Sequence, residues 1–332
     1  MLDLLKGLTG GGWAALYAWI FPSALAVGAF WLFVYPQIGV DVRTHFDALT
    51  GTEKTAVFFG VSVALGLALD AISTPLYRFL EGYAWPAALR NWGVSRHLAT
   101  KKRLETAVSE GTGWQLGLKL ERLARFPTED DEVAPTQLGN ALRSFETYGK
   151  TRFNLDSQTL WSELCAVAPK YIQDELDRSR ASVDFFVALV YLSAGFAVVS
   201  CGIAIAEKFR PGLLAVAVVA FASILLWYKM AVVSSSYWST TVQALVNVSR
   251  EKLAEQLGLQ IPGSIEAERE MWGALTQFVF FGDINKAKVL DSYRKSLATQ
   301  NATLNPDTPT ATEPLPSTQA SVGEKPQSES QE

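Results

Sequence analysis

Two long apolar runs dominate the second half of the chain. Positions 185–206 and 213–233 hold almost only apolar and small residues, and the short link 207–212 between them contains charges, a proline and a glycine. An α-helix rises about 1.5 Å per residue, so each run matches the hydrocarbon core of a bilayer, roughly 30 Å thick. Because a short polar link cannot lie in lipid, the runs predict a transmembrane hairpin of antiparallel helices.

Two further apolar runs lie near the N-terminus, at positions 13–35 and 55–73. The first carries Trp and Tyr near both ends, as membrane helices do at their interfaces, and Pro22 predicts a kink in it. It is too long for the apolar part of a typical cleaved signal peptide, so we interpret it as a retained membrane helix. Together the runs predict a first hairpin over 13–76 and a second over 185–233.

The polar segments between and after the hairpins also show helical patterns. Residues 77–184 are rich in helix formers and lack the alternation of strands, and they include a predicted amphipathic helix over 101–126. After the fourth apolar run a helix continues to position 257, and another is predicted over 265–281 behind Ser264, whose hydroxyl can cap it.

Neither polar segment has enough apolar surface to form a core by itself. We therefore expect the C-terminal helices of 234–298 to pack with 77–184 into one composite domain. The region 299–332 is poor in apolar residues and is predicted to be disordered. The predicted fold class is all-α: a polytopic membrane protein with four transmembrane helices and a composite cytoplasmic helical domain.

Basic residues near the ends of the four runs favour one orientation, with both termini and the large polar segment in the cytoplasm. On the predicted cytoplasmic side lie Lys6, Arg78, Arg90, Lys170, Arg178, Arg180, Lys229, Arg250 and Lys252. On the other side lie Arg43, Lys54, Lys208 and Arg210.

Composition, charge and the absence of motifs exclude several classes of ligand and of activity. The formal charge of −4 is concentrated in the C-terminal region, and the charges of 77–184 are balanced, so no basic stripe for nucleic acid or lipid headgroups is predicted. Cys165 and Cys201 do not suggest a disulfide framework, and His45 and His97 have no cysteine nearby, so no metal site is predicted. The common catalytic and cofactor-binding motifs are absent from the sequence, and we expect neither an enzyme nor a cofactor.

Five residues remain as candidates for the membrane interface or for helix packing. Asp70 is the one acid within the apolar part of the second run, and Arg78 and Glu81 follow it, three apart on one helical face. Gly60 and Gly66 belong to a series of small residues that allows helices to approach closely in lipid. If the protein were a membrane enzyme acting on lipid headgroups, its best candidate residues would be Asp70, Arg78 and Glu81. The alternative is a structural role, in which they hold the second helix against the polar domain.

Several stretches resemble a family of uncharacterised bacterial four-helix integral membrane proteins. They are PLYRFLEGYAW at 75–85, QLGNALRSFETYGKTRFNLDSQTLW at 137–161, REKLAEQLGLQIP at 250–262 and EREMW at 268–272. The resemblance implies four membrane helices with a cytoplasmic helical domain between the second and third, and it implies no reaction. The chain departs from the family pattern after Glu146, where Thr147 replaces an Asp-Arg pair.

These observations lead to two hypotheses about function. The first is a non-enzymatic protein of the bacterial inner membrane that anchors a cytoplasmic helical interaction domain, which binds other proteins or a second copy of itself. The alternative is an oligomeric pore or channel, or a membrane-perturbing effector, gated by the cytoplasmic domain. In both, the lipid bilayer surrounds the apolar helices and nucleic acid is not a partner.

Overall fold

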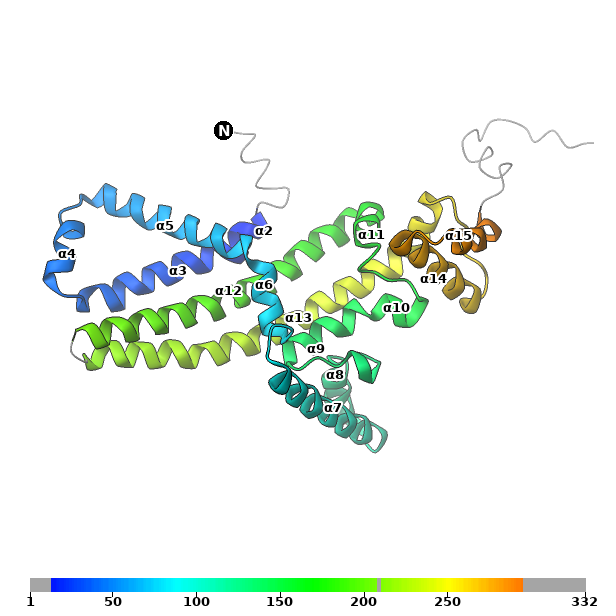
Figure 1. The fold of residues 1–332 in the computed structure, drawn as a ribbon, viewed down its shortest axis with the longest axis horizontal. Coiled ribbons are helices and arrows are strands. Elements are labelled where there is room, and N and C mark those ends of the chain that lie inside the picture. The colour runs from blue at the N-terminus through cyan, green and yellow to red at the C-terminus, as the bar shows by residue number, and fades with distance from the viewer. Residues whose placement is uncertain (1–12, 208–209, 295–332) are drawn as a thin grey trace, which may run out of the picture. The chain divides into compact units, whose positions relative to one another are not determined.

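A computed structural model describes residues 13–207 and 210–294, and the regular elements of these ranges are helices (Figure 1). The all-helical prediction is thereby confirmed. Residues 299–332, for which the sequence predicts disorder, lie outside the described residues.

Four stretches of the described chain are long and apolar enough to cross a membrane, as the sequence predicts. They are Leu16–Gln37, Gly51–Ala71 (α5), Lys170–Ala206 (α12) and Pro211–Gln256 (α13). The first stretch follows α2 (Trp13–Ala15) and is composite. It consists of a π-helical turn (Leu16–Ile20), α3 (Phe21–Ala29), a second π-helical turn (Phe30–Val34) and a 3-10 turn (Tyr35–Gln37). The short helix α4 (Val40–Asp47) joins it to α5.

The first π-helical turn ends at Ile20, two residues before Pro22. Proline has no N–H to donate, so the backbone around it cannot keep a regular α-helical hydrogen-bond ladder. The hydroxyl of Ser23 donates to the Trp19 carbonyl oxygen at 2.8 Å, so a side chain supplies a hydrogen bond at this irregular point. The helix thus accommodates Pro22 by changing its winding.

The helices α12 and α13 pack side by side and form the centre of the fold (Figure 1). Both continue well past their apolar runs: α12 begins at Lys170 and α13 ends at Gln256. The helix α3 packs on α5 and on α12, and the Tyr17 ring stacks on Phe185 with centroids 5.1 Å apart. Two continuous helices therefore connect the apolar stretches with the polar helices.

The polar helices lie in the chain between α5 and α12 and after α13, and three of them, α9, α10 and α11, pack on α13. They are α6 (Ser73–Glu81), α7 (Ala87–Ser109), α8 (Gly113–Leu123), α9 (Gln137–Glu146), α10 (Tyr148–Phe153), α11 (Trp161–Val167), α14 (Ile265–Phe281) and α15 (Ile284–Leu290). Short 3-10 turns cover Asp130–Glu132 and Asp291–Tyr293.

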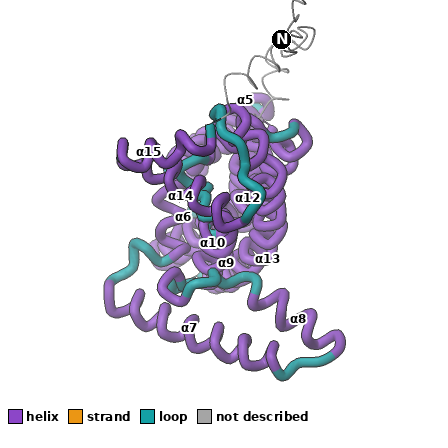
Figure 2. The backbone as a smooth tube through the Cα atoms, turned by 90° about the vertical axis from the view of Figure 1, so that its right-hand side faces the viewer, coloured by secondary structure: helices purple, strands orange, loops and turns teal. Residues whose placement is uncertain are grey.

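The prediction of a single helix over 101–126 is wrong. The chain leaves the helix after Ser109, and α8 starts at Gly113, which has a φ of 64°. Glycine adopts a positive φ without the steric cost that other residues incur, and here the chain reverses so that α7 and α8 form a hairpin (Figure 2). The apolar positions of 101–126 therefore belong to two facing helices.

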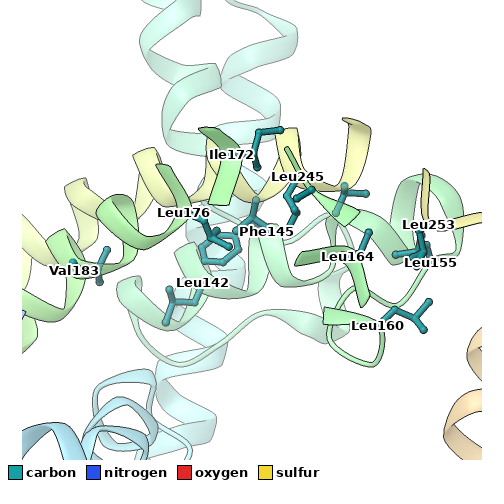
Figure 3. Close-up of a cluster of buried hydrophobic side chains, with 14 of the residues drawn as sticks. Leu142, Phe145, Leu155, Leu160, Leu164, Ile172, Leu176, Val183, Leu245 and Leu253 are labelled. Atoms are coloured by element: carbon teal, nitrogen blue, oxygen red, sulfur yellow. The ribbon is translucent and has the colours of Figure 1, made fainter. Parts of the chain in front are cut away.

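One buried cluster of apolar side chains joins the polar helices to α12 and α13 (Figure 3). Phe145 of α9, Leu164 of α11 and Leu245 of α13 meet in it, and Trp272 brings in α14. The same cluster extends to Trp19 in the first apolar stretch. The polar helices thus share a core with the ends of the apolar helices, which stabilises their attachment.

The helix α14 covers the range that the sequence predicts, and the Ser264 hydroxyl accepts from the Ala267 N–H at 3.2 Å as its cap. It packs against α10. The Arg269 guanidinium donates through Nη1 to the carbonyl oxygens of Thr151 at 2.6 Å and Arg152 at 2.7 Å. These bonds satisfy carbonyl groups near the end of α10 and hold the two helices together.

Candidate functional site

A polar cavity of about 480 Å³ lies where α6, α9, α12 and α13 meet, and we call it the junction cavity. Arg78 and Glu81 reach it from α6, Glu146 from α9, Arg180 from α12 and Trp238 from α13. It lies at the point where the chain passes from the second apolar helix into the polar helices. Of the predicted candidates, Arg78 and Glu81 are brought together here.

Close backbone contact between α6 and α9 positions the two acids of the cavity. A Cβ on Gly139 would lie 2.8 Å from the Glu81 carbonyl oxygen, so only glycine permits this approach. The Thr136 hydroxyl accepts from the Gly139 N–H at 3.0 Å and caps α9. Asn140 accepts from the Ala134 N–H at 2.8 Å through its side-chain oxygen. The Leu-Gly-Asn element at 138–140 therefore docks α9 onto the end of α6.

The two acids of the cavity, Glu81 and Glu146, have higher pKa values than ordinary surface carboxylates. Burial, followed by the nearby Glu146 carboxylate, raises the pKa of Glu81 to about 7, against the opposing effect of Arg143 and Arg78. Burial also raises the pKa of Glu146, while Arg143 lowers it. The Arg143 guanidinium lies 3.6 Å from the Glu146 carboxylate and forms a second ion pair with Glu132. Glu81 can therefore gain or lose a proton near neutral pH.

Further hydrogen bonds hold α6 on α12 at the wall of the cavity. The Tyr77 hydroxyl donates to the Asp184 carboxylate at 2.6 Å, and the Arg180 Nε lies 3.7 Å from the same carboxylate. The Tyr191 hydroxyl donates to the Leu76 carbonyl oxygen at 2.7 Å. Tyr77 and Arg180 thus both bind the Asp184 carboxylate, and these bonds hold α6 and α12 together beside Glu81.

The other predicted candidates lie outside the cavity. Asp70 is exposed near the end of α5 and is absent from the cavity lining. Gly66 is buried, and an added Cβ would lie 2.8 Å from the Ile20 Cα, so α5 closely approaches the first apolar stretch there. Gly60 is exposed, with no described heavy atom within 4 Å of an added Cβ.

Sequence reasoning missed Arg143, Glu146 and Glu132 as members of this site. Their meeting with Glu81 depends on the docking of α9 on α6, which no local pattern encodes. The one usable local signal was the spacing of Arg143 and Glu146, which are three apart on one helical face. In the described part of the chain, no group of three or more His, Cys, Asp or Glu side chains is arranged to hold a metal ion.

A second unusual feature is a group of exposed apolar side chains at the end of α14 and the start of α15, which we call the distal patch. It consists of Phe278, Val279, Phe280, Phe281 and Ile284. Phe281 is 75% exposed and Phe280 65%, and their rings contact each other with centroids 4.7 Å apart. The patch lies at the opposite end of α12 and α13 from α3 and α5 (Figure 1).

No family model matches the chain, and neither a curated protein nor a solved structure is similar to it.

Proposed function

We propose that the chain is a non-enzymatic membrane protein. Its four apolar helices cross the bacterial inner membrane and anchor a cytoplasmic helical domain, and this domain binds a second copy through the distal patch. The observation that carries this proposal is the patch itself. Consecutive large apolar side chains exposed to water cost free energy unless another surface covers them, and such patches mark interaction sites.

The position of the patch favours binding of another macromolecule over burial within the same chain. It lies beyond the buried core, since α14 is covered around Trp272 and exposed around Phe280. The C-terminal region that follows α15 is poor in apolar residues and has little with which to cover it.

The charges around the patch favour a second copy as the occupant. Asp283 precedes α15, and Lys286 and Lys288 are exposed on it, so the rim offers both signs of charge. A two-fold axis brings identical surfaces together, and a rim of mixed sign can then pair with itself. A shared membrane also holds copies in one orientation and at a high effective concentration.

The contacts around the junction cavity favour a structural role for it over a catalytic one. Tyr77 and Arg180 of its lining both bind the Asp184 carboxylate, and these contacts fix α6 against α12. Nucleophilic catalysis would need a nucleophile hydrogen-bonded to a base with room for a reacting group. The simplest role of the cavity is therefore to hold the helical domain on its membrane anchor.

Measuring the mass of the purified full chain by light scattering tests this proposal. We expect the wild type to be a dimer and the variant Phe280→Ser/Phe281→Ser to be a monomer. Trp114→Ser is the matched control, because Trp114 on α8 is 76% exposed and lies outside the patch, and this variant should remain a dimer. A monomeric wild type, or a dimer in the double variant, contradicts the proposal. A closed ring of four or more subunits that survives the double substitution favours the pore alternative instead.

A further inference from the structure

A larger cavity, of about 720 Å³, lies between the α7–α8 hairpin and the helices α6, α9 and α13. We call it the hairpin cavity. Its volume falls within the usual range of ligand sites. It does not share a lining residue with the junction cavity. It is therefore a separate site, and neither the junction nor the distal patch explains it.

Basic side chains converge on the hairpin cavity without an acid in its lining. Arg96 comes from α7, Arg122 from α8 and Arg125 from the turn after α8. Arg125 donates to Glu121 at 2.8 Å, but its Nε is buried and has no hydrogen-bond partner in the described chain. Within the described residues, neither Arg96 nor Arg122 forms an ion pair. The cavity therefore has unmatched positive charge, which favours an anion.

The polar lining supplies hydrogen-bond partners for such an anion. His97 lies beside Arg96, and burial together with this neighbouring charge lowers the pKa of His97. The imidazole is therefore neutral at pH 7 and can donate one hydrogen bond. The Arg96 guanidinium also lies over the Trp92 ring, with its central carbon 5.4 Å from the ring centroid. This contact orients the charge without neutralising it.

Another part of the lining is apolar and reaches the end of a membrane-spanning stretch. Phe79 and Leu80 of α6 and Phe126 contribute to it, as do Tyr228 and Val232 of α13. Tyr228 and Val232 lie within the last turns of the apolar run 213–233, so this wall is at the predicted boundary between lipid and water. A ligand with a charged head and an apolar chain would match both parts of the lining.

We propose that the hairpin cavity binds the headgroup and upper acyl region of an anionic phospholipid. The phosphate group lies against Arg96, Arg122 and Arg125, and the acyl chain lies along Phe79 and Val232 toward the bilayer. A zwitterionic lipid fits less well because its own cation meets the arginines. This inference rests on the membrane location in the proposed function, but it does not depend on self-association. The sequence concealed the site, because the charges of 77–184 cancel when summed and only folding separates them.

Native mass spectrometry of the detergent-solubilised full chain tests the proposal with three probes. These are phosphatidylglycerol, phosphatidylcholine with the same acyl chains, and inorganic phosphate. We expect the wild type to prefer phosphatidylglycerol over phosphatidylcholine by on the order of tenfold, because the choline cation offsets the attraction between the lipid phosphate and the arginines. The variant Arg96→Gln/Arg122→Gln should bind both lipids equally. Arg103→Gln/Arg178→Gln removes the same charge from exposed positions outside the cavity and should keep the preference.

Three results would overturn the proposal. They are equal binding of both lipids by the wild type, an unchanged preference in Arg96→Gln/Arg122→Gln, and displacement of phosphatidylglycerol by an equal concentration of inorganic phosphate. The last would show that a free anion occupies the cavity. The single variant Arg122→Gln should show a reduced preference and checks the result if the double variant is unstable. The distal-patch variant should keep the lipid preference, so failure of self-association and failure of lipid binding are distinguishable.

Discussion

The Tyr77 hydroxyl donates a hydrogen bond of 2.6 Å to the Asp184 carboxylate, which joins α6 to α12 beside the junction cavity. The Asp184 side chain is buried, and Arg180 lies 3.7 Å from it as its cationic partner. The bond links residues that are far apart in the sequence, at the point where the chain leaves its second apolar helix. It therefore couples the position of the polar helices to the membrane anchor.

The first prediction concerns this bond. Tyr77→Phe keeps the ring and removes the donor, which leaves a buried carboxylate oxygen unsatisfied. We expect the free energy of unfolding to fall by about 1–3 kcal/mol. The measurement is thermal unfolding of the purified protein in one detergent. Tyr171→Phe serves as control, because Tyr171 is exposed on α12 and its substitution should leave the melting temperature unchanged. Equal melting temperatures for Tyr77→Phe and wild type would show that the bond does not stabilise the junction.

A second prediction tests the close approach of α9 to α6. In Gly139→Ala the new Cβ lies 2.8 Å from the Glu81 carbonyl oxygen and 2.9 Å from the Ala134 Cβ, so the helices have to separate. We expect a loss of about 1–3 kcal/mol in stability. Gly117→Ala is the matched control: Gly117 is exposed within α8 with open space around it, and alanine should stabilise that helix by about 0.5–1 kcal/mol. The two alanine variants should therefore shift the melting temperature in opposite directions, and a shift of the same sign would refute the packing argument.

A third prediction concerns pH. The pKa of Glu81 is about 7 in the folded chain, against 4.5 for an ordinary glutamate. Between these values the folded state holds a proton that the unfolded state has released, so this group makes stability fall as pH rises from 4.5 to 7. Glu146 acts with the same sign, because burial raises its pKa too. Glu81→Gln should therefore reduce the fall in stability with rising pH without abolishing it.

Melting temperatures at pH 5, 6, 7 and 8 measure this effect. Relative to wild type, Glu81→Gln should gain stability at pH 8, since no buried charge forms in the variant. Glu251→Gln, at an exposed position on α13, controls for the loss of one acid and should follow the wild-type curve. Parallel curves for wild type and Glu81→Gln would contradict the raised pKa.

The sequence predicts those parts of the fold that depend on local signals. The helix 265–281 was predicted because Ser264 caps it locally, and the four apolar runs because their length alone matches a bilayer. The break between α7 and α8 was missed, since an amphipathic pattern can be shared by two helices that face each other across a turn at Gly113. The spacing of apolar residues in a helix does not show where the chain turns back on itself.

The functional sites depend on packing between distant segments, and the sequence predicts them only in part. Arg78 and Glu81 were identified from their spacing on one helix. The proximity of Glu146 to Glu81 was not, because it requires α9 to dock at Gly139. The convergence of arginines on the hairpin cavity was likewise missed, since charge balance along a segment contains no information about which side chains share a surface.

Thiol labelling in intact cells tests most directly whether the four apolar helices cross a membrane and place the polar helices on its inner face. In a Cys165→Ser/Cys201→Ser background, single cysteines replace Thr52, exposed at the start of α5, and Glu110, exposed in the turn between α7 and α8. A membrane-impermeant maleimide should label Thr52→Cys in intact cells and Glu110→Cys only after permeabilisation. Labelling of both positions in intact cells would contradict a membrane-spanning anchor with a cytoplasmic helical domain.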